Sequence, residues 1–187
     1  MLDIPKSFHL QYSRRQIQDR VEKLGREISL WSSEVWEHSH SDILTIPVLR
    51  GGIFFFADLV REISGSVEIF PAQTWAYEPG VNQVMRSDVK VRIDDIPAKG
   101  RAILLIDDIC DSGKTLQALS EALRQSGALE VRSAVLIRRA VHEQAYDPEW
   151  VGFEYVGPEW FVGYGMEDSG RWRNLADIFV IQQNEEQ

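Results

Sequence analysis

The chain has 187 residues, of which 44% are hydrophobic and 26% are charged. This length and composition are ordinary for a globular protein, so we expect residues 1–187 to form a single domain. The formal net charge of −9 argues against an extended nucleic-acid-binding surface. Cys110 is the single cysteine, which excludes an intrachain disulfide and favours a reducing, cytoplasmic location.

The N-terminal segment predicts one amphipathic helix. Residues 1–10 contain neither a basic lead nor an apolar core, so we expect no signal peptide, and no apolar run reaches membrane-spanning length. A capping-box pattern at residues 13–16 opens the helix, and its apolar positions recur at helical spacing: Ile17, Val21, Leu24 and Ile28. Over residues 31–41 the pattern loosens, which predicts a polar connection. His38 and His40 in it have the spacing of a metal pair, but solvated loop residues are the favoured interpretation without a third ligand.

Strands and helices alternate through the rest of the chain. Their order predicts an α/β fold with a central, mostly parallel, twisted sheet flanked by helices and a small appended lobe. Segment 78–88 combines Pro, Gly, Asn and Ser with little apolar periodicity, which is typical of a mobile loop. The expected strands are 43–49, 67–77, 89–93 at an edge, 102–106, 131–137, 150–155, 160–164 and 178–181, and the expected helices are 53–63 and 116–127.

The stretch Ala102–Leu116, AILLIDDICDSGKTL, is the most informative in the chain. An apolar run that ends abruptly in two acids indicates a strand buried on both faces, and ligands bind beyond the carboxyl ends of such strands. The small residues at 112–115 allow backbone N–H groups to face an anion, and Lys114 adds a positive charge. Acids beside such a cradle suit a sugar phosphate. Receiver-type signalling domains share this pattern, and an Asp at a strand end can simply cap the next helix.

Other segments at strand ends carry polar groups. Leu49–Gly52 has glycines that permit close backbone approach and suits a second anion, although a generic tight turn explains it equally well. Arg138 and Arg139 follow an expected strand, where a solvated pair is the alternative. The segment 160–173 combines aromatic surface with charge, as in a base-stacking platform or in an ordinary core with its loop. Cys110 lies between Asp108 and Asp111, and we interpret it as a packed side chain rather than a reactive thiol.

Together these segments resemble the type I phosphoribosyltransferases, and most closely the hypoxanthine/guanine phosphoribosyltransferases. Ile106–Leu116 is similar to that family's signature for phosphoribosyl pyrophosphate (PRPP), and Leu49–Gly52 is similar to its pyrophosphate loop. Phe153-Glu154 and the run Trp160–Leu175 resemble its purine-side segment. The resemblance implies the type I phosphoribosyltransferase fold with a hood lobe from the two chain ends, a base-binding lobe at about 150–181 and a lid at 78–88.

The resemblance also implies an activity and a division of roles. The activity is transfer of phosphoribose from PRPP to a 6-oxopurine in purine salvage, with release of pyrophosphate and Mg²⁺ as cofactor. Asp107 and Asp108 would hold the ribose hydroxyls, and Asp111 would act as general acid/base. The ribose phosphate would be held by a run of five residues, namely Asp111, Ser112, Gly113, Lys114 and Thr115.

The remaining implied roles concern pyrophosphate, the base and the metal. Arg50, Gly51 and Arg173 would bind pyrophosphate. Trp160 would stack on the base, Phe161 would read its edge through backbone groups, and Arg138 would donate to the 6-oxo oxygen. Glu167 would help to place Mg²⁺ together with the acids Asp107 and Asp108.

Five of these positions depart from the family pattern, and at the first of them Asp107 stands where Glu is frequent. Arg138 and Arg50 replace lysines, Glu167 replaces an aspartate and Trp160 replaces a phenylalanine. Several of these changes lie on the base side. One alternative is therefore a phosphoribosyltransferase with another acceptor, such as xanthine or a pyrimidine. The other is a non-catalytic sensor of PRPP or of a nucleotide. The expected partners are PRPP and a nucleobase, with neither nucleic acid nor membrane, and the resemblance implies a homodimer or homotetramer.

Overall fold

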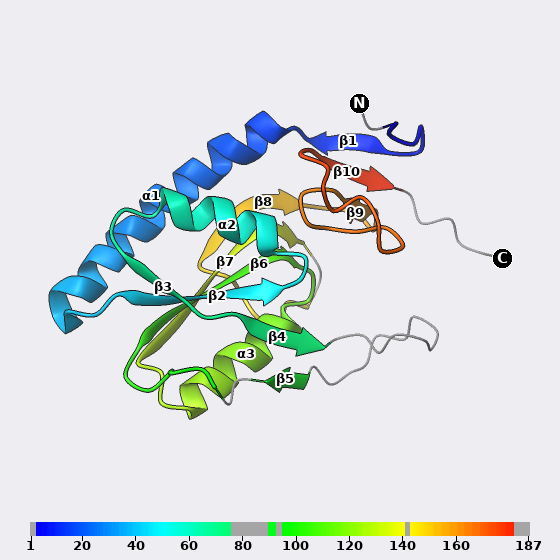
Figure 1. Cartoon of the computed structure of the whole chain (residues 1–187). Helices are drawn as coiled ribbons and strands as arrows, with labels where there is room; N and C mark the ends of the chain where they lie inside the picture. The colour runs from blue at the N-terminus through cyan, green and yellow to red at the C-terminus, as the bar shows by residue number, and fades with distance from the viewer. Residues whose placement is uncertain (1–2, 76–89, 93–94, 141–142, 182–187) are drawn as a thin grey trace.

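The computed structural model describes residues 3–75, 90–92, 95–140 and 143–181. Five parallel strands lie in the order β4-β2-β6-β7-β8, with β5 antiparallel at the β4 edge and β3 also paired to β2. The predicted α/β fold with a mostly parallel central sheet is confirmed (Figure 1). In chain order the elements are β1 (His9–Tyr12), α1 (Arg14–Ser39), β2 (Ile43–Leu49), α2 (Ile53–Glu62), β3 (Val67–Ile69), β4 (Ala72–Trp75), β5 (Lys90–Arg92), β6 (Ala102–Cys110), α3 (Lys114–Gln125), β7 (Glu130–Arg139), β8 (Trp150–Tyr155), β9 (Trp160–Val162) and β10 (Ile178–Ile181).

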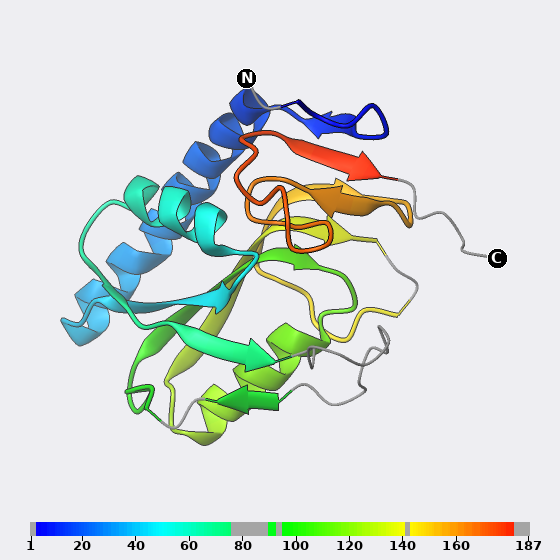
Figure 2. The ribbon, with the colours of Figure 1, turned by 45° about the vertical axis from the view of Figure 1, so that its right-hand side comes forward.

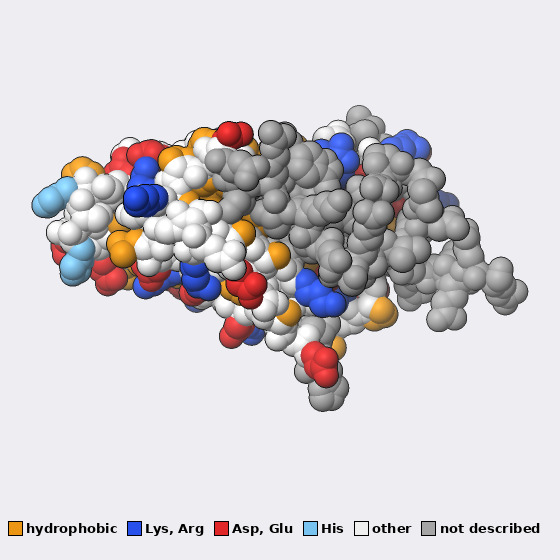
Figure 3. Space-filling model, turned by 90° about the horizontal axis from the view of Figure 1, so that it is seen from below, with side chains coloured by type: hydrophobic (Ala, Val, Ile, Leu, Met, Phe, Trp, Pro, Cys, Tyr) orange, Lys and Arg blue, Asp and Glu red, His pale blue; other side chains and the backbone are white. Residues whose placement is uncertain are grey.

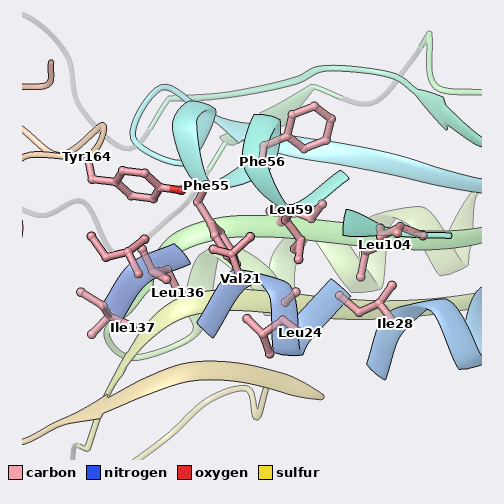
Figure 4. Close-up of a cluster of buried hydrophobic side chains, with 14 of the residues drawn as sticks. Val21, Leu24, Ile28, Phe55, Phe56, Leu59, Leu104, Leu136, Ile137 and Tyr164 are labelled. Carbon is pink, nitrogen blue, oxygen red and sulfur yellow. The ribbon is translucent and has the colours of Figure 1, made fainter. Parts of the chain in front are cut away.

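Helices cover both faces of the central sheet. The helices α1 and α2 pack on one face and α3 packs on the other (Figures 1 and 2). On the first face, the apolar stripe of α1 meets Phe55 and Leu59 of α2 over Leu104 and Leu136 of the sheet (Figure 4). The spacing of the apolar residues in α1 places them on one side of the helix, where their burial stabilises the fold.

The sheet has a switch point between β2 and β6, which are neighbours. From β2 the chain passes through α2 towards β4, and from β6 it passes through α3 towards β7, in opposite directions across the sheet. The chain therefore leaves β2 and β6 in opposite directions at the carboxyl edge, and open α/β sheets bind their ligands at such a switch point. Both predicted anion-binding segments lie at this edge.

A small antiparallel sheet of β1, β10 and β9 stands beside the carboxyl edge. We refer to these three strands, together with residues 163–177, as the hood. The backbone N–H of Arg14 donates to Asp177 Oδ1 at 2.7 Å, and the Tyr164 hydroxyl donates to Asp58 Oδ2 of α2 at 2.6 Å. The hood thus joins both ends of the chain to the helical face of the core. Strand β8, within the range 150–181 expected for the small lobe, pairs with β7 in the central sheet.

The first helix is longer than predicted, because the expected polar connection at 31–41 is helical as far as Ser39. Trp31 is only 3% exposed, lies with its ring 5.5 Å from that of Trp150 and donates from Nε1 to Glu130 Oε2 at 3.0 Å. The hydroxyl of Ser39 donates to the carbonyl of Val35 at 2.7 Å. Tertiary packing at Trp31 overrides the weak helix preference of the serines.

Several strands differ from their predicted bounds, and two of these differences are large. The strand expected over 67–77 is divided into β3 and β4 around Phe70-Pro71, because proline has no N–H to donate to a ladder. The strand expected over 102–106 continues to Cys110, since Asp107 pairs with Val135 and Cys110 with Arg138 in β7. The two acids therefore lie within the ladder and not beyond it. The lid segment 78–88 lies outside the described residues.

The outer surface gives two further observations. None of the helices in the described part of the chain is both long and apolar enough to cross a membrane. On the face seen in Figure 3, acidic and basic side chains are interspersed among polar and apolar ones.

Candidate active site

Two acids near the end of β6, the buried Asp107 and the partly buried Asp108, form the centre of the candidate site. Asp107 is 8% exposed, and the backbone N–H of Asp108 donates to its Oδ1 at 3.0 Å. Burial, together with the charge of neighbouring Asp108, raises the pKa of Asp107 well above its usual range. Burial also raises the pKa of Asp108, although hydrogen bonds and the Arg173 guanidinium oppose this effect. The pair is therefore poised to gain from a ligand that brings hydrogen-bond donors or positive charge.

The loop that joins β6 to α3 forms the predicted cradle. Gly113 adopts a left-handed φ of +77°, and a Cβ at this position would lie 2.8 Å from the backbone of Tyr146. Only glycine fits both this conformation and this contact. Helix α3 begins at Lys114, and no side chain caps its N-terminus in the described structure. The first N–H groups of α3 are thus free of side-chain caps, as an anion site requires.

Residues 144–146 support this cradle from behind. The backbone N–H of Ala145 donates to the Ser112 carbonyl at 2.8 Å, and Gln144 Nε2 donates to the Asp111 carbonyl at 3.2 Å. Sequence reasoning missed this segment, because it carries no motif and lies more than 30 residues from its partners. Its contact with Gly113 is the one feature that a sequence could have suggested, through the need for a glycine there.

The loop after β2 lies directly against the acids of β6. A Cβ at Gly51 would lie 2.1 Å from Asp108 Oδ2, and one at Gly52 would lie 3.3 Å from the Asp107 Cα atom. The Leu49–Arg50 peptide bond is cis, and the Arg50 side chain is exposed. The structure therefore brings the two predicted anion-binding segments together at the switch point.

The hood contributes a second group of predicted residues. Arg173 donates from Nη1 to the Gly165 carbonyl at 2.6 Å and forms an ion pair with Glu167 at 3.1 Å. Trp160 is 39% exposed, and its Nε1 donates to the Glu167 carbonyl at 2.6 Å. Three of the predicted hood residues are therefore connected to one another. The Arg173 charge also acts on Asp108, which links this group to the acids of β6.

The two arginines at the end of β7 have different partners. Arg138 holds the Glu154 carboxylate through Nε at 3.0 Å and Nη2 at 2.6 Å, and also pairs with Asp147. Arg139 donates from Nε to Asp111 Oδ1 at 2.7 Å. Arg139, to which sequence reasoning gave no specific role, is therefore the arginine that contacts the predicted general acid/base. Only the proximity of Arg138 and Arg139 to a strand end hinted at this in the sequence.

Cys110 lies between the acids but is not activated. The thiol is free and buried, and it accepts a hydrogen bond from Gln144 Nε2 at 3.3 Å. Burial raises its pKa to about 11, so the thiolate is scarce at neutral pH. These properties agree with its interpretation as a packed side chain.

The carboxylates of the site suit a hard cation that takes most of its ligands from the substrate and from water. Asp107 offers a buried carboxylate and Asp108 a partly buried one, and burial raises the pKa of both. Glu167 is paired with Arg173 and is not free. In the part of the chain that the structure describes, no group of three or more His, Cys, Asp or Glu residues forms a metal cage. Mg²⁺ commonly binds one or two carboxylates together with substrate phosphates and water, so the residues present fit it.

Comparison with known proteins places this arrangement among phosphoribosyltransferases. Residues 13–169 match the family model of the phosphoribosyl transferase domain. The chain is 34% identical to a Bacillus subtilis hypoxanthine-guanine phosphoribosyltransferase over 91% of both chains. It is 32% identical to the Haemophilus influenzae hypoxanthine phosphoribosyltransferase over 89% of this chain and 90% of that one. A Bacillus anthracis hypoxanthine-guanine phosphoribosyltransferase structure is 27% identical, has a TM-score of 0.76 and covers 93% of this chain and 97% of its own.

Proposed function

Because this chain belongs to the hypoxanthine phosphoribosyltransferase family, we propose that it transfers phosphoribose from PRPP to a 6-oxopurine, hypoxanthine or guanine. The products are the nucleoside monophosphate and pyrophosphate, and the reaction serves purine salvage. The observation that carries the proposal is the contact between the Gly51 loop and the acids Asp107 and Asp108. This contact joins a candidate sugar site to a candidate pyrophosphate site at the carboxyl edge of the sheet.

The acids of β6 suit the reacting sugar. When the bond from the ribose C1 atom to the pyrophosphate oxygen breaks, the ring develops positive charge, which nearby carboxylates stabilise. In the proposed complex, the ribose hydroxyls donate to Asp107 and Asp108. These hydrogen bonds favour the charged carboxylates and so oppose the effect of burial, which raises the pKa of both acids.

Asp111 and the cradle complete the sugar side of the proposal. The base nitrogen forms the new bond to C1, and the proton that it loses passes to the Asp111 carboxylate. The ribose phosphate is held by Lys114 and by the N–H groups of Ser112, Gly113 and Thr115, at the uncapped start of α3. Asp111 lies one residue before this cradle, so a single rigid segment positions both the phosphate and the proton acceptor.

The leaving group is assigned to the two loops that face Asp108. Arg50 and Gly51 of the β2 loop and Arg173 of the hood bind pyrophosphate in this proposal. Mg²⁺, held by Asp107, Asp108 and Glu167 together with substrate oxygens, would supply charge neutralisation on the pyrophosphate. Glu167 is paired with Arg173, so this ion pair must rearrange slightly when Glu167 binds Mg²⁺ and Arg173 binds pyrophosphate.

The base side carries the proposed specificity. Trp160 stacks on the purine, Phe161 reads its edge through backbone groups, and Arg138 donates to the 6-oxo oxygen. Arg138 already holds Glu154 through two donors and Asp147 through a third, so its remaining N–H groups must serve the base. This commitment favours a second candidate function, in which the acceptor is xanthine or a pyrimidine.

A pyrophosphate-release assay tests the proposal. The protein is supplied with PRPP, Mg²⁺ and, in turn, hypoxanthine, guanine, xanthine, adenine and uracil. Turnover of hypoxanthine or guanine with the largest kcat/KM supports the proposal. Turnover confined to xanthine or uracil supports the second candidate, and binding of PRPP by calorimetry without any turnover indicates a sensor.

Matched variants test the assigned chemistry. We expect Asp111→Asn to reduce kcat by about 100-fold or more while the Kd for PRPP changes only severalfold, because proton transfer typically contributes 10²–10⁴-fold. Asp19→Asn removes one exposed carboxylate from α1 and should behave like the wild type. We further propose a cytoplasmic homodimer or homotetramer, which light scattering of the purified protein distinguishes from a monomer.

A further inference from the structure

Arg139 connects the predicted general acid/base to the hood. Its Nε donates to Asp111 Oδ1 at 2.7 Å, its Nη2 donates to the Glu159 carbonyl at 3.1 Å, and its Nη1 donates to the Gly157 carbonyl. The guanidinium also lies 5.0 Å from the ring centroid of Phe161. The side chain is 15% exposed, whereas that of Asp111 is 50% exposed.

These contacts fix the Arg139 side chain in one arrangement. Three separate nitrogen atoms are engaged, and the planar guanidinium packs over an aromatic ring, so few other rotamers keep all of its partners. The half-exposed Asp111 carboxylate has far fewer restraints of its own. Its orientation is therefore set largely by the fixed Nε–H of Arg139, which occupies Oδ1 and leaves Oδ2 available.

We propose that Arg139 is a positioning residue that orients Asp111 for proton transfer and aligns it with the hood segment that receives the base. This inference rests on the proposed function and deepens it. The carbonyls that anchor Arg139 lie immediately before β9, where Trp160 and Phe161 are assigned to the base. A shift of this strand therefore moves the arginine and, with it, the carboxylate.

Arg138 cannot take this role in the structure. Its donors hold Asp147 and Glu154, and Cys110 is its partner in the β6–β7 ladder. Arg139, the next residue, points to the other side of the strand, where Tyr155 and Phe161 lie 5.5 Å and 5.0 Å from its guanidinium. Because side chains alternate along a strand, adjacent arginines serve different faces of the sheet.

The kinetic test compares Arg139→Gln and Arg139→Lys with the wild type. Loss of an orienting partner commonly lowers activity by about 10- to 100-fold, and we expect Arg139→Gln to lower kcat by that factor. The KM for PRPP should stay within about twofold, since Arg139 has no assigned contact with PRPP. Arg139→Lys keeps the charge but not the planar fork, so it should recover only part of kcat.

A matched control comes from the same strand. Arg132 forms an ion pair through Nε with Glu130 at 2.6 Å and lies 5.0 Å from the Trp31 ring, at the opposite end of β7. Arg132→Gln thus removes the same kinds of contact away from the site. It should lower the melting temperature while leaving kcat near the wild-type value.

A double-mutant cycle separates positioning from a merely structural role. In the Asp111→Asn background, Arg139→Gln should reduce kcat by less than about threefold, because the group that it orients has lost its function. An equal factor in both backgrounds would show that Arg139 only supports the fold, and would overturn the inference.

A spectroscopic readout keeps this test distinct from that of the proposed function. The Arg139 Nε–H resonance, identified by its loss in Arg139→Gln, should exchange slowly with water in the wild type and at least tenfold faster in Asp111→Ala. If the wild type turns over none of the bases, the proposed function fails, and the orienting role in proton transfer fails with it. If turnover is present but the Nε–H exchanges equally fast in both proteins, the inference alone is overturned.

Discussion

The contact between the hood and the β2 loop can be tested by one added methyl group, in Gly165→Ala. Gly165 has φ +103°, and a Cβ at this position would lie 2.0 Å from the Gly51 carbonyl oxygen. Real Cβ atoms essentially never come closer than 3.0 Å to such an atom, so the two segments must separate by about 1 Å. Because Gly51 packs against the Asp108 carboxylate, the separation displaces the assigned pyrophosphate site.

Gly65 provides the matched control for this substitution. It has φ +100°, nearly the same as Gly165, but a Cβ there meets nothing within 4 Å. An L-residue in the left-handed region costs roughly 1–2 kcal/mol in either variant. The clash adds roughly 1–3 kcal/mol at Gly165 alone, and a misplacement of about 1 Å near reacting groups can lower turnover by on the order of 100-fold.

Urea unfolding and the pyrophosphate-release assay measure both effects. We expect Gly65→Ala to lose roughly 1–2 kcal/mol of unfolding free energy and to keep its kcat/KM for PRPP. Gly165→Ala should lose more stability and about two orders of magnitude in kcat/KM. Equal stability and equal activity in the two variants would refute the idea that the hood and the β2 loop touch at this point.

Three further outcomes follow from the acids and the cradle. The raised pKa of Asp107 means that the folded state binds more protons than the unfolded state, so the unfolding free energy falls as pH rises above the ordinary value of 3.8. Asp107→Asn should therefore stabilise the ligand-free protein at pH 7 by on the order of 1 kcal/mol in urea unfolding, with a smaller gain at pH 4. Lys114→Ala should raise the Kd for PRPP by roughly tenfold or more in calorimetry, and unchanged affinity would contradict the cradle. Cys110, with its pKa raised to about 11, should resist iodoacetamide at pH 7.5 in the folded protein and react after denaturation.

The parts of the fold that could be predicted are those with strong local patterns. The apolar run 102–106 and the alternation of strands with helices gave the central sheet, because buried parallel strands need long apolar segments. The bounds of β6 could not be predicted, since the polar residues Asp107 and Asp108 end the apolar pattern. The ladder nevertheless continues, because β7 supplies backbone partners as far as Arg138.

Helix α1 shows the opposite error, in which local pattern underestimates tertiary packing. Trp31 follows Ile28 by three residues and so continues the apolar spacing, but the serines and charged residues around it made this part of the pattern look like a polar connection. Trp31 is buried because Trp150 and Arg132, more than 100 residues away, surround its ring. Such contacts depend on the sheet order, which periodicity alone does not determine.

In the candidate site, too, local motifs could be predicted from the sequence, whereas contacts between distant residues could not. The loop segments with glycines and acids could be located from the sequence, since their residue types suit anions and sugar hydroxyls. The pairing of Arg139 with Asp111 could not, because neighbouring arginines on a strand differ only in the face to which they point. The ion pair between Arg173 and Glu167, at 3.1 Å, could not be predicted either, because it depends on how the hood folds.

The buried acid pair is the strongest physical reason to regard this edge as functional. Burial raises the pKa of both carboxyls, and the charge of Asp108 raises that of Asp107 further, so the pair destabilises the ligand-free fold at neutral pH, whereas apolar residues at the same positions would extend the β6 ladder without that penalty. The neighbouring groups relieve only part of it, because Gly51 has no side chain and the Arg173 guanidinium, which lowers the pKa of Asp108, is also paired with Glu167. Further compensation comes from a ligand that donates hydrogen bonds or positive charge to Asp107 and Asp108.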